Sequence, residues 1–81
     1  PDIDNKTINI YSVDNNIYVE FNYPDIEKGE IIVYNILGKE IVRKDIKRAY
    51  VYKLCINNSD GKYFVIVITN KKIKDLKVII K

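Results

Sequence analysis

Residues 34–41 read YNILGKEI, and they predict the tip of a β-hairpin near the middle of the 81-residue chain. An apolar run, Ile31–Tyr34, enters this stretch, and a mixed run, Glu40–Arg43, leaves it. Gly38, one of only three glycines, stands between the two runs. A glycine at that place supplies the positive φ that a hairpin loop of about three to five residues needs. We therefore expect Asn35 and Gly38 to form the turn.

The composition predicts one small β domain. Ile and Val dominate the apolar residues, seven Tyr and two Phe accompany them, and Met and Trp are absent. β-Branched and aromatic side chains fit a pleated, half-buried surface, and an apolar fraction of 47% argues against disorder. A domain of this size buries roughly 60–65% of its unfolded surface, so its core is small.

Seven short stretches have the composition of strands and lie about 8–12 residues apart, a spacing typical of a β-sandwich. Two of them are apolar on both faces and therefore central, whereas residues 39–46 are more charged and belong nearer an edge. We expect an all-β, antiparallel sandwich without helix, preceded by a linker at residues 1–7. The predicted strands are residues 8–12, 17–22, 29–36, 39–46, 50–56, 63–69 and 73–80. The predicted core includes Val19, Phe21, Ile31, Val33, Leu54, Val65 and Val67.

Residues 57–61, NNSDG, are the strongest turn signal in the chain and predict a hairpin turn. Their oxygen side chains are faintly similar to a calcium-binding loop. Such a loop needs a bidentate Glu about six residues after its glycine, and position 67 is Val. We therefore expect no metal site there.

The sequence offers no recognisable catalytic group. Histidine is absent, which removes the usual general base and zinc ligand. The carboxylate pairs Asp2 with Asp4 and Asp25 with Glu27 lie in loops without apolar flanks that would raise a pKa. No glycine-rich phosphate loop is present. The single cysteine, Cys55, lies in an apolar run and predicts a buried, unreactive thiol. The sequence thus predicts a domain that is not an enzyme and uses no cofactor.

Tyrosines recur within the predicted strands and allow two interpretations. They form cross-strand pairs that stabilise a small sheet, or they form an exposed stripe that binds sugars. Basic residues alternate with apolar ones, which argues against nucleic acid as a partner, and no apolar stretch is long enough to span a membrane. Residues 1–30 carry a charge balance of −5 and residues 39–81 one of +8, a pattern typical of solvated faces. The tyrosines are Tyr11, Tyr18, Tyr34, Tyr50, Tyr52 and Tyr63.

Residues 71–81 combine five lysines with an apolar strand. One interpretation is an edge strand that its lysines protect from aggregation. The other is a terminal signal, in which a receptor reads a basic residue and the free carboxylate. Composition alone favours the first.

Three segments together resemble the C-terminal sorting domains of type IX secretion. Residues 34–41 resemble their YN-x-LG-x-E-V hairpin. Gly61–Tyr63, followed by the apolar run 65–68, resembles their G-x-Y strand. Residues 77–81, KVIIK, resemble their ending. The segments occur in the family's order, and the resemblance covers residues 8–81.

This resemblance implies a seven-stranded immunoglobulin-like sandwich at the end of a secreted Bacteroidetes-type protein, with residues 8–81 as the sorting domain. It implies that a preceding cargo domain crosses the inner membrane first. The type IX translocon then carries the cargo through the outer membrane, and a sortase-like peptidase often removes the domain and couples the cargo to a surface lipid. The cargo is therefore expected to be secreted or to reach the cell surface. The expected signal residues are Gly61, Tyr63, Lys77, Val78, Ile79, Ile80 and Lys81.

We expect Val78, Ile79 and Ile80 to hold the last strand in the sandwich, with Lys77 and Lys81 projecting toward solvent. An alternative function is an immunoglobulin-like accessory or adhesive module of a bacterial surface protein or secreted hydrolase, which spaces domains or binds glycans.

Overall fold

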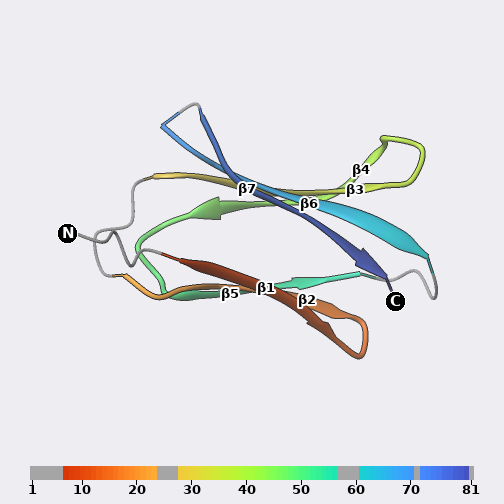
Figure 1. Ribbon diagram of the computed structural model, residues 1–81, viewed down its shortest axis with the longest axis horizontal. Coiled ribbons are helices and arrows are strands. Elements are labelled where there is room, and N and C mark those ends of the chain that lie inside the picture. Colours follow the sequence, from red (N-terminus) through yellow and green to blue (C-terminus); the bar gives the residue numbers. More distant parts are fainter. Residues whose placement is uncertain (1–6, 24–27, 57–60, 71, 81) are drawn as a thin grey trace.

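The structure, a computed structural model, describes residues 7–23, 28–56, 61–70 and 72–80, and within them it is built from strands without a helix. Figure 1 shows the strands stacked in two layers. The all-β prediction is confirmed. The strands are β1 (Ile8–Val13), β2 (Asn16–Phe21), β3 (Gly29–Asn35), β4 (Glu40–Ile46), β5 (Val51–Cys55), β6 (Lys62–Thr69) and β7 (Lys72–Ile80).

The two layers are a three-stranded sheet, in the order β1-β2-β5, and a four-stranded sheet, in the order β4-β3-β6-β7. Every pairing is antiparallel. As predicted, the two doubly apolar strands, β3 and β6, are central, and the charged strand β4 lies at an edge. The sheets also meet along their edges, because β1 contacts β7 and β4 contacts β5.

The core lies between the sheets and follows from strand alternation. In β2, Ile17, Val19 and Phe21 are buried, and the side chains between them are half-buried. All seven predicted core residues are buried in one cluster. Among the side chains that the structure describes, the cluster comprises Ile10, Ile17, Val19, Phe21, Ile31, Val33, Ile46, Tyr52, Leu54, Ile56, Tyr63, Val65 and Val67.

Tyr52 secures the connection by which the chain passes from the four-stranded sheet to the three-stranded one. Its side chain is 5% exposed, and its hydroxyl oxygen accepts hydrogen bonds from the backbone N–H groups of Lys47, at 2.8 Å, and Ala49, at 2.9 Å. Arg48, between these two donors, has a φ of +67°, which a non-glycine residue rarely adopts. The two bonds hold the backbone on both sides of this unfavourable conformation.

Two predictions made from apolar runs and turn residues were wrong. Cys55 is exposed, because alternation along β5 turns Tyr52 and Leu54 inward and Cys55 outward. Residues 57–61 do not close a hairpin, because β5 and β6 belong to different sheets. Residues 57–60 themselves lie outside the described part of the chain.

Gly29 has a structural role that the hairpin analysis did not identify. It pairs with Thr69 on β6, and a Cβ at position 29 would lie only 1.9 Å from the carbonyl oxygen of Ile68. Only a residue without a side chain permits this close approach of β3 to β6. A glycine at the start of an otherwise apolar strand is the sequence signal that indicates it.

Candidate functional site

The predicted hairpin tip is a short loop between β3 and β4 that is closed by four hydrogen bonds, all of which involve Asn35. The backbone N–H of Asn35 donates to the carbonyl of Lys39 at 2.9 Å, and the N–H of Gly38 donates to the carbonyl of Asn35 at 3.0 Å. The Oδ1 atom of Asn35 accepts two more bonds, from the N–H groups of Leu37 and Lys39, each at 2.9 Å. Asn35 therefore ties both sides of the loop together through its backbone and its side chain.

Gly38 has a φ of +83°, as a hairpin loop at this place requires. A Cβ at this position would meet no atom within 4 Å, so space does not explain the need for glycine. The backbone conformation does, because L-residues with a side chain rarely adopt it.

The G-x-Y stretch combines a second backbone requirement with a core residue. Gly61 has a φ of +147°, and Lys62, the first residue of β6, is exposed. Tyr63 is only 2% exposed and belongs to the core cluster. The folded domain thus presents almost none of the Tyr63 side chain to a partner.

The sheet register brings the three resembling segments to one end of the four-stranded sheet. Asn35 on β3 pairs with Tyr63 on β6, and Tyr63 pairs with Ile79 on β7. In Figure 1 the β3–β4 hairpin and the end of β7 accordingly lie toward the same side of the molecule. We call residues 35–39, 61–63 and 77–80 the signal end.

Within β7, the backbone places each expected signal residue in register with β6. Lys77 pairs with Val65, Val78 with Phe64, Ile79 with Tyr63 and Ile80 with Lys62. The expectations for the side chains of residues 77–80, that Lys77 projects toward solvent and that the three apolar residues hold the strand in the sandwich, concern atoms outside the described part of the structure, and Lys81 lies outside it entirely.

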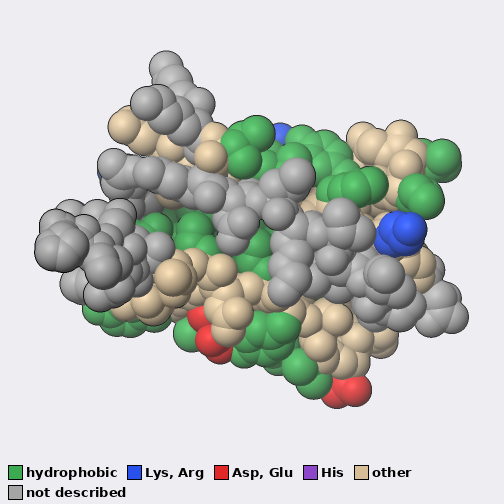
Figure 2. Space-filling model, viewed as in Figure 1, with side chains coloured by type: hydrophobic (Ala, Val, Ile, Leu, Met, Phe, Trp, Pro, Cys, Tyr) green, Lys and Arg blue, Asp and Glu red, His purple; other side chains and the backbone are tan. Residues whose placement is uncertain are grey.

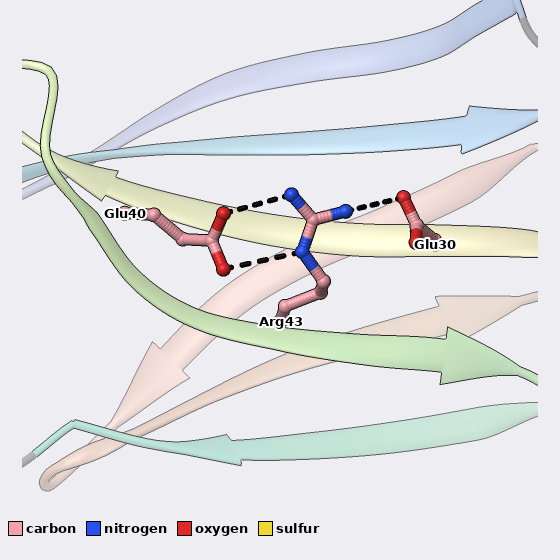
Figure 3. Close-up of polar contacts among 3 residues, drawn as sticks. All are labelled: Glu30, Glu40 and Arg43. Carbon is pink, nitrogen blue, oxygen red and sulfur yellow. Dashed lines mark hydrogen bonds and ion pairs between the residues drawn. The ribbon is translucent and has the colours of Figure 1, made fainter.

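Arg43 links two glutamates on the four-stranded sheet, as Figure 3 shows. Its Nη1 atom donates to Glu30 Oε1 at 2.5 Å, while Nη2 and Nε donate to the two carboxylate oxygens of Glu40 at 2.8 and 3.1 Å. These hydrogen bonds lower the pKa of Glu40 and raise that of Arg43. Arg43 also lies opposite Ile32, which is only 3% exposed although it is not part of the inner core.

The tyrosines of the described strands support the cross-strand interpretation. Tyr11 and Tyr18 pair across β1 and β2, with their rings stacked at a centroid distance of 5.3 Å. Tyr11 also donates a hydrogen bond from its hydroxyl to Glu20, and this bond raises the pKa of Tyr11. Tyr52 and Tyr63 are buried. Tyr52 and Tyr63 therefore stabilise the core and contribute nothing to an exposed stripe, whereas Tyr11 and Tyr18 form a half-buried cross-strand pair.

A groove of about 770 Å³ lies at the opposite end of the four-stranded sheet from the hairpin tip. Its lining mixes both signs of charge and comprises Lys28, Gly29, Glu30, Asp45, Ile46, Lys47, Arg48 and Asn70. Among the described residues, no group of three or more His, Cys, Asp or Glu side chains is placed to hold a metal ion. The same residues include no helix with the length and apolar character needed to cross a membrane.

Two further features of the four-stranded sheet were missed by the sequence analysis. The glutamate-arginine cluster joins positions 30, 40 and 43, and only the Glu40–Arg43 spacing is local enough to suggest an ion pair. The loop residues Ile36 and Leu37 are largely exposed, at 63% and 87%. Apolar residues between Asn35 and Gly38, where turns usually carry polar side chains, are the signal that could have identified this exposure.

Comparison with known proteins gives a match to one family. A family model described as "Secretion system C-terminal sorting domain" matches residues 5–81. The match spans the hairpin, the G-x-Y stretch and the whole of β7. It gives no support to the accessory or adhesive module. No curated protein and no solved structure matched the chain significantly.

Proposed function

We propose a mode of recognition for this chain, which belongs to the family of secretion system C-terminal sorting domains. The domain is a C-terminal sorting signal for type IX secretion. Such a signal implies a cargo N-terminal to the domain and export of that cargo to the outer membrane, the cell surface or the medium. The proposal concerns the surface that the secretion apparatus reads and the fate of the cargo after export.

The proposed route follows the family. The cargo passes through the periplasm and is carried across the outer membrane by the type IX translocon, and a sortase-like peptidase acts on it at the cell surface. The domain itself carries no catalytic activity. Residues 8–81 form the sorting domain and residues 1–7 the linker to the cargo. The start of β1 at Ile8 supports this division, while the family match begins at residue 5 and Thr7 is already hydrogen-bonded to Asn22.

The proposed architecture is an immunoglobulin-like sandwich. In that fold, strands A, B and E share one sheet and strands C, F and G the other. The orders β1-β2-β5 and β3-β6-β7 agree with this division. Strand β4 pairs with the outer edge of β3, where it corresponds to an extra strand beside strand C.

The translocon reads the signal end together with Lys81, which follows it, and the main determinants are the last residues of β7 and Lys81. The observation that carries this proposal is the register Asn35–Tyr63–Ile79, which gathers three segments distant in sequence at one end of one sheet. Gly61 and Tyr63 contribute through the fold, the first by its backbone conformation and the second by filling the core. Lys77, Val78, Ile79 and Ile80 contribute as the strand that the receptor contacts.

The test measures stability and surface display on the same variants of a fusion that consists of a signal peptide, a reporter and residues 1–81. Lys81→Ala, or a short extension after Lys81, changes only the end of the fusion, so we expect its thermal midpoint to move by no more than about 2–4 °C. Surface display should nevertheless fall. Lys53→Ala, at an exposed position on the other sheet, is the matched control and should display normally. Normal display of the extended fusion would contradict recognition of the chain end.

A further inference from the structure

The β3–β4 hairpin carries two large apolar side chains where a turn usually carries polar ones. Ile36 is 63% exposed and Leu37 is 87% exposed, the highest value among the large hydrophobic residues that the structure describes. Figure 2 shows hydrophobic side chains projecting at the end of the molecule where Figure 1 places this hairpin. Such a tip departs from the polar composition of most turns, and it offers apolar area that a partner can bury.

This apolar tip is held in one conformation. Asn35 accepts hydrogen bonds from Leu37 and Lys39 through its side chain and from Gly38 through its carbonyl. The loop is therefore ordered before any partner binds. An anchor that is ordered in advance loses little conformational entropy on binding, and this is what gives a small contact useful affinity.

The tip is continuous with the surface already proposed to be read. Asn35, at the base of the tip, pairs with Tyr63 on β6, and Tyr63 pairs in turn with Ile79 on β7. A partner that contacts the end of β7 can therefore reach Ile36 and Leu37 without crossing the sandwich.

We infer that Ile36 and Leu37 form an anchor that inserts into an apolar pocket of a protein of the type IX apparatus. The inference rests on the proposed function, since it assumes that the signal end is the surface that the apparatus reads. A protein pocket fits better than a lipid surface. Even a single fatty-acyl chain gives only marginal, reversible membrane binding, and two aliphatic side chains bury less apolar area than that chain. Inside a larger protein interface, by contrast, one or two buried anchors carry much of the affinity.

The first test compares matched substitutions in the same reporter fusion. In the double variant Ile36→Thr with Leu37→Ser, surface display should fall by at least about tenfold, the loss expected for a binding hot spot, with an unchanged thermal midpoint. Ile73→Thr is the matched control, because Ile73 is 64% exposed and lies at the other end of the sheet, opposite Ile68. The control should display like the parent. Equal display of the double variant and the parent overturns the inference.

The second test identifies the partner with a photoreactive amino acid at position 37, and at position 73 as the control, in cells that export the fusion. An adduct at position 37 with an identified component of the type IX apparatus, absent at position 73, supports the inference. An adduct with lipid alone, or no adduct, overturns it. If the unaltered fusion itself is retained in the cell, the proposed function fails, and the anchor fails with it. If the parent is displayed and the double variant at positions 36 and 37 is displayed equally well, the anchor alone fails.

Discussion

Asn35 and Tyr63 lie opposite each other on the two central strands of the four-stranded sheet, although 27 intervening residues separate them in the sequence. Asn35 builds the hairpin tip through its side chain, and Tyr63 fills the core beneath the start of β6. Their pairing explains why a turn motif and a strand motif occur together in one sorting domain: each positions the same end of the sheet, beside the last residues of β7.

Gly38→Val should destabilise the domain by about 1–3 kcal/mol, because valine must adopt the φ of +83° that the loop requires. The cost comes from the backbone conformation and not from crowding by neighbouring residues, since a Cβ at position 38 would meet no atom within 4 Å. Gly38→Asn is the control and should cost less, because asparagine tolerates this conformation better. Urea unfolding measures both variants. A valine variant as stable as the parent would show that the loop does not depend on this conformation.

Tyr52→Phe should destabilise the domain by about 1–3 kcal/mol, because the N–H groups of Lys47 and Ala49 lose their shared acceptor. Tyr50→Phe is the matched control. Tyr50 is 52% exposed, so its variant should stay within about 0.5 kcal/mol of the parent. Denaturant midpoints of the two variants decide the matter, and equal midpoints would contradict the role given to the Tyr52 hydroxyl.

Acidification should weaken the cluster of Glu40 and Arg43. Because hydrogen bonds from Arg43 lower the pKa of Glu40 in the folded state, this carboxylate contributes stability that is fully present above its ordinary pKa of 4.5. That contribution is lost as the pH falls through the lower, folded-state pKa. The measurement is the thermal midpoint of the parent and of Glu40→Gln between pH 7 and pH 2. The difference between the two proteins should shrink as the pH drops, and a constant difference would count against the assignment.

The thiol of Cys55 should react with a disulfide reagent in the folded protein, because its side chain is exposed on β5. The reaction rate should change little when the protein is unfolded in urea. Cys55→Ser provides the blank. Reaction only after unfolding would mean that the thiol is buried and that alternation along β5 is reversed.

The strands could be predicted from the sequence because period-two alternation and β-branched residues act locally. Ile17, Val19 and Phe21 show this, since a single strand determines which of its faces is buried. The same alternation predicts an exposed Cys55, because Tyr52 and Leu54 occupy the buried face of β5; the apolar character of the neighbouring residues indicated the opposite. The sequence pattern therefore predicts a structural feature correctly where that feature depends on a single strand.

Features that depend on which strands become neighbours could not be read from the sequence. The close approach of Gly29 to Ile68 and the bond from Arg43 to Glu30 both need the sheet register. The crossing from β5 to β6 between sheets was mistaken for a hairpin for the same reason. The gathering of the signal end likewise follows from strand order and not from any one motif.

The measurement that tests the account most directly is the location of a reporter fused between a signal peptide and residues 1–81. It is made in a bacterium with a working type IX system and in an otherwise identical strain that lacks the translocon. The account predicts that added protease or antibody reaches the reporter on intact cells of the first strain, or finds it in the medium, and that the second strain retains it in the periplasm. A folded, intact fusion that stays in the periplasm of both strains would contradict the assignment of this chain as a sorting signal.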